Sequence, residues 1–268
     1  MSSSSGALSA LRLRPAVWRG VAGVAVLLVA AEAFTRAGLA DESYLPPASS
    51  ILAETGRLLA RTDFLGAVWT TVRAVLIGLA LATAVAVPVG IVLGLGRTAY
   101  AAAMTIIEFL RPIPSVALIP LAILLYGRGT EMKVALVVYA CVWPILFNTI
   151  YGIRNVDPVA VDTARVLGFG RLRIGAQVYL PSASPFIFTG IKVAASIAII
   201  LAVTAELLAG GREGSGIGVQ MLEAQASANQ LQAYAVTVVA GLIGLVFYLV
   251  LWAVERRLFA WAAEGEGA

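Results

Sequence analysis

Polar residues inside the long apolar segments are the first candidates for chemistry in this chain. Four of them fall within or beside such segments: Arg111, Asn148, Lys192 and Glu206. A charged side chain is costly in lipid, so it normally lines a solute pathway or pairs with an opposite charge. Arg111 and Lys192 lining a pathway would favour an anion such as a sulfonate. In the alternative, they pair with Glu108 and Glu206, or extend toward the membrane surface.

Several common kinds of chemistry are missing. The chain has no histidine and one cysteine, Cys141, in an apolar segment. This excludes an intrachain disulfide, a Cys/His zinc site and histidine-based acid–base catalysis. A phosphate-binding GxxxxGK[ST] loop and a GxGxxG element after a strand are also absent, so we expect no nucleotide, metal or other cofactor on this chain. Its basic residues are scattered over loops, so nucleic acid is not an expected partner.

The elements that must position these residues are membrane helices. Of the 268 residues, 60% are hydrophobic and 13% charged, and the mean hydropathy is +0.92; soluble domains carry about 25% charged residues. A β-barrel alternation is not present, so we expect an all-α integral membrane protein with six transmembrane helices. The apolar stretches lie at 20–35, 72–96, 101–126, 132–152, 184–208 and 234–254.

The chain divides into three parts on this basis. Residues 1–66 hold the first span and an external amphipathic segment, 67–258 form the transmembrane core with a polar loop at about 155–182, and 259–268 form a tail. Basic residues favour a cytoplasmic location for both termini and for the loop. The inner segments then hold Arg12, Arg14, Arg19, Arg97, Arg154, Arg165, Arg171, Arg173, Arg256 and Arg257, and the outer ones only Arg36, Arg57, Arg61, Arg128, Lys133 and Arg212.

Two features of the N-terminal part leave alternatives open. The stretch from Ser2 to Ala33 resembles a signal peptide with a small-residue cleavage site, and the alternative is an uncleaved first span. After the rigid Pro46-Pro47 pair, apolar residues recur at helical spacing from Ile51 to Leu59. This pattern predicts an amphipathic helix that lies along the membrane surface or acts as a packing elbow for the second span.

The polar loop contains the signals of a short helix. Asp157 suits an N-cap, Pro158 suits the first helical position, and Gly168 suits a C-terminal stop. A helix over 158–167 would be about 15 Å long, so it needs packing to persist. One face would carry Val159, Thr163, Val166 and Leu167, and Asp162 could pair with Arg165 on another. The apolar face must therefore dock on a partner or on the protein's own helix ends.

Glycines and prolines in the spans predict packing and kinks. Gly90-x-x-x-Gly94, with Gly241 and Gly244 in the last span, would permit close helix contacts, either inside the chain or in a dimer. Three prolines should kink or unwind the third span: Pro112, Pro114 and Pro120. The Gly-rich run Gly210–Gln232 is predicted as an external loop, a lid or a contact for a partner.

A spaced motif carries a family resemblance. The chain reads Asp162-Thr163-Ala164, three residues, Gly168, nine residues, Val178, one residue, Leu180-Pro181. This resembles the cytoplasmic loop of bacterial ABC importer permeases: Glu-Ala-Ala, three residues, Gly, nine residues, Ile, one residue, Leu-Pro. Asp replaces Glu and Thr replaces the first Ala. The likeness to the nitrate, sulfonate and taurine branch continues in Leu110-Arg111-Pro112-Ile113-Pro114, Ile119-Pro120-Leu121-Ala122, Tyr126-Gly127-Arg128-Gly129, Pro144-Ile145-Leu146-Phe147-Asn148-Thr149 and Ala205-Glu206-Leu207.

The resemblance implies a transport subunit of the bacterial inner membrane, not an enzyme. In such permeases the loop helix is a coupling helix seated on a separate ABC ATPase, which binds ATP and Mg; two permease copies, here a homodimer, line one pathway in the lipid bilayer. An extracytoplasmic substrate-binding protein delivers the solute, for this branch a small anion such as a sulfonate, taurine or nitrate. The coupling residues would be Asp157, Pro158, Asp162, Thr163, Ala164, Arg165, Gly168, Leu180 and Pro181.

Two other classes fit parts of the sequence. A secondary transporter or channel without an ATPase would explain the spans, but it should show repeated halves and no docking loop, and we find no internal repeat. An intramembrane enzyme would need a nucleophile, acid or metal set that this composition does not supply.

Overall fold

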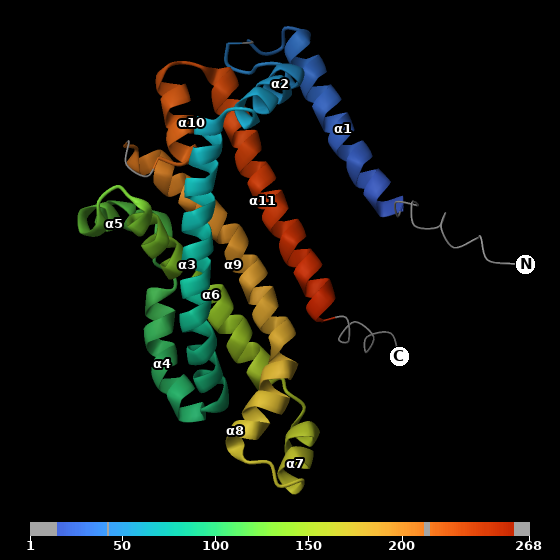
Figure 1. Cartoon of the computed structure of the whole chain (residues 1–268), viewed down its shortest axis with the longest axis vertical. Coiled ribbons are helices and arrows are strands. Elements are labelled where there is room, and N and C mark those ends of the chain that lie inside the picture. Colours follow the sequence, from blue (N-terminus) through green and yellow to red (C-terminus); the bar gives the residue numbers. More distant parts are fainter. Residues whose placement is uncertain (1–14, 42, 212–214, 260–268) are drawn as a thin grey trace, which may run out of the picture.

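The computed structural model describes residues 15–41, 43–211 and 215–259 of the chain. Within these ranges every regular element is a helix, as the composition predicts. The bundle is elongated, with α7 (Pro158–Val166) and α8 (Arg171–Ile174) at one end and α10 (Ile217–Ala226) at the other (Figure 1). We call these the α7 end and the α10 end. The start of the predicted signal peptide, Arg212 and residues 260–268 of the predicted tail lie outside the described residues.

Three long helices form the centre of the bundle. They are α3 (Thr62–Leu95), α6 (Thr130–Arg154) and α9 (Leu180–Ala209), and α6 packs along both of the others. Their shared core contains small, fully buried side chains such as Ala82 and Ala194. Small side chains let membrane helices approach closely, where dispersion contacts replace the hydrophobic effect that drives packing in water.

Glycines make the α3–α6 contact closer still. A Cβ atom added at Gly90 would lie 2.6 Å from Thr149 Cβ, and one added at Gly94 would lie 2.7 Å from Ile153 Cβ. The predicted close contact at these glycines is therefore confirmed, and it is internal to the chain. In α11 (Gln230–Leu258) no such contact forms inside the chain, because nothing lies within 4 Å of a Cβ added at Gly241 or Gly244; a contact of these two glycines in a dimer stays a prediction.

The predicted spans coincide with the observed helices. Among the described residues, five helices are long and apolar enough to cross a bilayer: 18–36, 62–95, 130–154, 171–209 and 230–258. The remaining predicted span, 101–126, is a bent pair of helices. Helix α3 begins ten residues before its predicted span. Its 34 residues reach about 50 Å, whereas apolar residues need to cover only the roughly 30 Å of hydrocarbon. The first turns of α3 therefore extend beyond the stretch that an apolar run can locate.

The predicted break in the third span is present. Helix α4 (Arg97–Leu110) is followed by a 3₁₀ turn and then by α5 (Ile119–Tyr126), and the two parts of the span differ in direction by 75°. Pro112 and Pro114 lie in the break, whereas Pro120 lies in the first turn of α5, where the missing N–H removes no helical hydrogen bond. The prolines thus end one helix and begin the next.

The first helix stands apart from the bundle (Figure 1). Helix α1 (Pro15–Arg36) is joined to α2 (Ala48–Leu59) by the carboxylate of Glu32, which accepts hydrogen bonds from the backbone N–H and the hydroxyl of Ser49, both at 2.9 Å. Helix α2 buries Leu58 in a cluster with residues of α11. It therefore serves as a packing elbow, one of the two alternatives for this segment.

The Gly-rich run at the α10 end contains a helix as well as a loop. Gly210 and Gly211 both have positive φ values, +57° and +98°, and reverse the chain after α9. Helix α10 then packs on α9 and α11. The run is therefore not only a loop, because it contains a short helix packed against the bundle; its role as a lid or as a contact for a partner stays a prediction.

Candidate coupling surface and pathway residues

The local signals in the polar loop produce the predicted helix and both of its ends. The Asp157 carboxylate accepts a hydrogen bond from the Val159 N–H at 2.9 Å, and Pro158 occupies the first helical position. At the other end, Gly168 has φ +78°, its N–H donates to the Arg165 carbonyl, and the Phe169 N–H donates to the Ala164 carbonyl. This pair of bonds is a Schellman motif, which needs the left-handed conformation that glycine adopts freely.

Helix α7 has two apolar faces. One face places Val161 and Ala164 in a small buried cluster with Ile174 of α8. This cluster holds the short helix against the protein's own helix ends. The opposite face is exposed, with Val159 69%, Val166 88% and Leu167 67% accessible. The face predicted to dock is therefore exposed, and α7 packs on its own chain through Val161 and Ala164, a face that was not predicted.

The polar residues of α7 are also on the surface. Arg165 Nη1 donates to Asp162 Oδ1 at 2.8 Å, which confirms the predicted pair, and both side chains are about two-thirds exposed. Such a pair contributes at most about 0.5 kcal/mol to helix stability. Thr163 donates its hydroxyl to the Val159 carbonyl. These side chains are therefore available for an interaction outside the chain.

The second half of the predicted loop is helical. Residues 171–209 form one helical segment, comprising α8, a wide turn at Gly175–Tyr179 and α9. Leu180 and Pro181 thus begin α9 rather than ending a loop. A proline inside an α-helix clashes with the carbonyl four residues before it. The π-helical turn lies directly before Pro181, where a wider turn relieves this clash.

Glu206 is at the centre of a buried polar network near the α10 end. Its carboxylate accepts hydrogen bonds from Lys133 Nζ at 2.8 Å, Thr71 Oγ1 at 2.9 Å and the Gly218 N–H at 3.0 Å. The Thr71 hydroxyl oxygen also accepts from the Ile217 N–H at 3.1 Å. The side chains of Lys133 and Glu206 are only 2% exposed. One carboxylate thus joins α3, α6, α9 and the first turn of α10.

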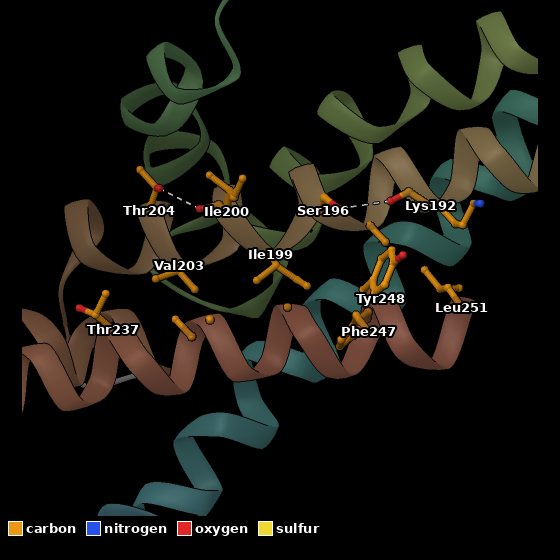
Figure 2. Close-up of a pocket in the computed structure, with 14 residues that line it drawn as sticks. Lys192, Ser196, Ile199, Ile200, Val203, Thr204, Thr237, Phe247, Tyr248 and Leu251 are labelled. Carbon is orange, nitrogen blue, oxygen red and sulfur yellow. Dashed lines mark hydrogen bonds between the residues drawn. The ribbon is translucent and has the colours of Figure 1, made fainter. Parts of the chain in front are cut away.

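Lys192 has a different partner from the predicted one. Its Nζ donates to Glu255 of α11 at 2.6 Å, and both side chains are 28% exposed. The predicted pairing with Glu206 is wrong, because Lys192 and Glu206 lie at different levels of α9. Lys192 pairs with Glu255 of α11, and Glu206 pairs with Lys133 of α6. Figure 2 shows Lys192 at one end of a cavity of about 530 Å³ between α9 and α11, where Ser196 and Tyr248 also line the wall.

Arg111 and Asn148 lie together at the break between α4 and α5. The Arg111 guanidinium carbon is 4.7 Å from the ring centroid of Phe147. Asn148 Nδ2 donates to the Pro144 carbonyl at 2.8 Å. Both residues line a cavity of about 460 Å³. An ion pair between Glu108 and Arg111 is not found among the described residues, so this predicted alternative is not realised.

The partners of the charged residues in the long helices were not predicted. Lys133 was counted as a basic residue of an outer segment, and Thr71 and Glu255 were not singled out. An acidic residue in an apolar helix signals that some partner exists. The partner's identity depends on which helices pack together, because Glu206 and Lys133 are 73 positions apart in the chain.

Comparisons with known proteins agree with this architecture. The family model for the binding-protein-dependent transport system inner membrane component matches residues 86–260. A putative ABC transporter permease protein of Methanocaldococcus jannaschii is 35% identical over 191 residues, 71% of each chain. The taurine transport system permease protein TauC of Escherichia coli is 31% identical over 247 residues, 90% of this chain and 88% of that one.

More distant likenesses extend the same picture. The putative aliphatic sulfonates transport permease protein SsuC of Bacillus subtilis is 26% identical over 93% of this chain and 89% of its own length. A chain of the inward-facing MetNI methionine ABC transporter has a TM-score of 0.63 at 16% identity, and covers 72% of this chain and 95% of that chain. The latter shows a shared fold.

A bundle of membrane helices with an exposed helix at one end is the architecture of a transporter's membrane subunit. The chain belongs to the family of binding-protein-dependent transport system inner membrane components. It is a permease subunit of an ABC importer in the nitrate, sulfonate and taurine branch. The resemblance first seen in the loop motif is thereby confirmed, and the reading as a secondary transporter or channel is set aside.

Proposed function

We propose that this permease is driven by a separate ATPase subunit that binds the exposed face of α7 on the cytoplasmic side. The observation that carries this proposal is the free apolar surface formed by Val159, Val166, Leu167 and, on α8, Leu172, which is 92% exposed. We call it the coupling surface. Exposed apolar side chains that cluster at a polar end of a membrane protein mark a protein interface. ATP and Mg belong to the ATPase in this scheme, and this chain catalyses no bond change.

The other loop residues hold the coupling surface in place. Asp157, Pro158 and Gly168 define the ends of α7, and Ala164 anchors it from behind. Asp162, Thr163 and Arg165 present polar groups beside the apolar patch, where hydrogen bonds would fix the orientation of the ATPase. Leu180 and Pro181 connect the surface to α9. Movement of the ATPase would therefore reach the membrane through α8 and α9.

We further propose that the transported solute is a small anion. Relatives of this chain are named for taurine, aliphatic sulfonates and nitrate. Within the described residues, Lys192 and Glu206 are neutralised by Glu255 and Lys133, whereas Arg111 has no acidic partner in the ion pairs. Arg111 and Asn148 are thus the best pathway candidates. Lys192 and Glu206 instead form ion pairs that join neighbouring helices in this conformation.

We infer two further partners, a second permease copy and a substrate-binding protein. One chain supplies one wall, so a second copy would supply the other in a homodimer within the inner membrane. An external substrate-binding protein would dock at the α10 end and deliver the anion. The basic residues at the α7 end, such as Arg171 and Arg173, support a cytoplasmic position for that end and for both termini.

The coupling surface can be tested by adding a charge to it. In Leu167→Asp, a carboxylate would be buried at the ATPase contact without a partner, so the ATPase should no longer copurify and uptake should fall at least about tenfold. The matched control is Leu39→Asp, the same change at a residue that is 68% exposed near the opposite end. Equal copurification of the ATPase with both variants would contradict the proposal. Purification of the wild-type permease without any ATPase would instead favour function as a channel.

A further inference from the structure

One face of α6 carries a stripe of aromatic and basic side chains that the permease fold alone does not explain. Tyr139, Trp143, Phe147 and Tyr151 recur every four residues, and Arg154 follows three residues later. Residues at this spacing share one side of a helix. Trp143, Phe147, Tyr151 and Arg154 are not fully buried. The stripe runs from the break in the third span to the α7 end.

Two cavities lie along this stripe and share part of their walls. The upper cavity, about 460 Å³, is lined by Arg111 and Trp143, and the lower cavity, also about 460 Å³, is lined by Tyr100 and Arg154. Phe147 and Asn148 border both cavities. Cavities of this size accommodate small-molecule ligands. They are thus neighbouring compartments that meet at two residues of α6.

Each cavity contains one arginine held over an aromatic ring. The Arg111 guanidinium carbon is 4.7 Å from the Phe147 centroid, and that of Arg154 is 3.6 Å from the Tyr100 centroid. Stacking leaves the edge of a guanidinium, with its N–H donors, free to bind an oxyanion. Phe147 and Arg154 are seven residues apart, or about 10 Å along α6.

The charge balance of the cavities favours an anion. Arg111 and Arg154 are the charged residues that line them, and the lining of neither cavity includes an acidic residue. Ion pairs of the described residues involve neither arginine. The cavity between α9 and α11 differs, because its Lys192 is neutralised by Glu255 at 2.6 Å. Charged side chains of membrane proteins face a water-filled cavity or a partner, and neither arginine has an acidic partner in the lining of its cavity, so each can bind an anion there.

Polar donors beside Arg111 strengthen the upper site. Trp143 Nε1 is buried without a hydrogen-bond partner, which is unfavourable unless an acceptor arrives. Asn148 uses one amide hydrogen on the Pro144 carbonyl and retains a second. The Tyr139 hydroxyl hydrogen is not available to an anion, because it is donated to the Leu110 carbonyl at 2.7 Å. This bond holds the end of α4 beside the cavity.

We propose that the α6 stripe is the wall of a two-station route for small monovalent oxyanions. Arg111, with Trp143 and Asn148, binds the anion at the break in the third span, and Arg154 binds it next at the α7 end. Asn148 and Phe147 form the passage between the stations. The proposal rests on the proposed function as an anion importer, and it adds Trp143, Tyr100 and Arg154 to the pathway.

Charge-selective labelling of an introduced cysteine tests the route. In the Cys141→Ala background, Asn148→Cys is treated with anionic sulfonatoethyl and cationic trimethylammonioethyl methanethiosulfonate, in neutral-lipid nanodiscs with the ATPase, with and without ATP. The anionic reagent should react about tenfold faster, because a nearby unpaired cation raises its local concentration. Adding Arg111→Gln should remove most of this preference, and sodium nitrate or methanesulfonate should slow the labelling.

The lower station and a control site complete the experiment. At Tyr151→Cys, which lines the lower cavity, Arg154→Gln should reduce the anionic preference more than Arg111→Gln. Ser196→Cys, in the cavity lined by Lys192, whose charge is neutralised by Glu255, should show no such preference. Equal rates for both reagents at Asn148→Cys, no labelling in either nucleotide state, or protection by inorganic phosphate but not by the monovalent anions would overturn the route. These readouts do not depend on uptake, so ATPase copurification separately reports whether the proposed coupling fails.

Discussion

Gly168 shows how one residue determines the shape of the coupling loop. Its φ of +78° is a conformation that glycine adopts freely, yet a Cβ added there would meet no atom within 4 Å. Gly170 also has open space around a Cβ, but its φ is −70°. The two glycines therefore differ in backbone conformation and not in crowding.

Gly168→Ala should strain the end of α7, at a cost of about 1 kcal/mol, whereas Gly170→Ala should cost little. We expect Gly168→Ala to lower ATP-driven uptake several-fold with normal membrane insertion, and Gly170→Ala to remain near the wild type. Uptake assays in the same vesicles, normalised to permease content, compare the two. Equal uptake by both variants would show that the Schellman turn does not matter for coupling.

Glu206 is the most consequential single charge inside the bundle. Replacing it by Gln removes the carboxylate that balances the buried Lys133, so Glu206→Gln should destabilise the protein by about 3 to 5 kcal/mol. Lys192→Gln breaks a pair that is 28% exposed and should cost much less. Thermal unfolding of the two purified variants in the same detergent checks this order. A larger loss in Lys192→Gln would contradict it.

At the scale of elements, the helix positions could be read from the sequence more readily than their contacts. Apolar runs located every span, and Asp157, Pro158 and Gly168 located α7, because these signals act on neighbouring residues. The inward face of α7 was missed, since Val161 becomes buried only when Ile174 packs against it. The partner of Lys192 was missed for the same reason, as Glu255 lies 63 positions away.

The glycine seam between α3 and α6 gives a prediction for a pair of matched substitutions. Gly90→Ala would place a Cβ 2.6 Å from Thr149 Cβ, so the helices must separate and stability should fall by about 1 to 3 kcal/mol. Gly241→Ala meets nothing within 4 Å and should be neutral or stabilise α11 by about 0.5 to 1 kcal/mol. Unfolding temperatures of the two variants provide the measurement; a tighter α11 contact in the assembly would appear as a loss in Gly241→Ala.

For the whole molecule, α1 is the element least integrated into the bundle. It packs chiefly on α2, and its apolar side chains Val24, Leu27 and Val29 are more than 60% exposed. The remaining helices surround a core that α1 does not enter. The stability of the isolated permease should therefore depend little on this helix.

Removal of residues 1–37 should leave the unfolding temperature of the purified permease within about 2 °C of the full chain, because little core packing is lost. Circular dichroism during heating measures this change. A drop of about 10 °C or more would show that α1 stabilises the bundle itself. If stability is retained and uptake is lost, α1 acts through the assembled transporter.

The unbroken helical segment from Arg171 to Ala209 links the two ends of the molecule. Its 39 residues make a rod about 58 Å long. A tilt of about 5° at one tip therefore swings the other tip by about 5 Å, roughly the pitch of one helical turn. Since Glu206 ties the far tip to α3, α6 and α10, such a swing would move these helices together at the α10 end.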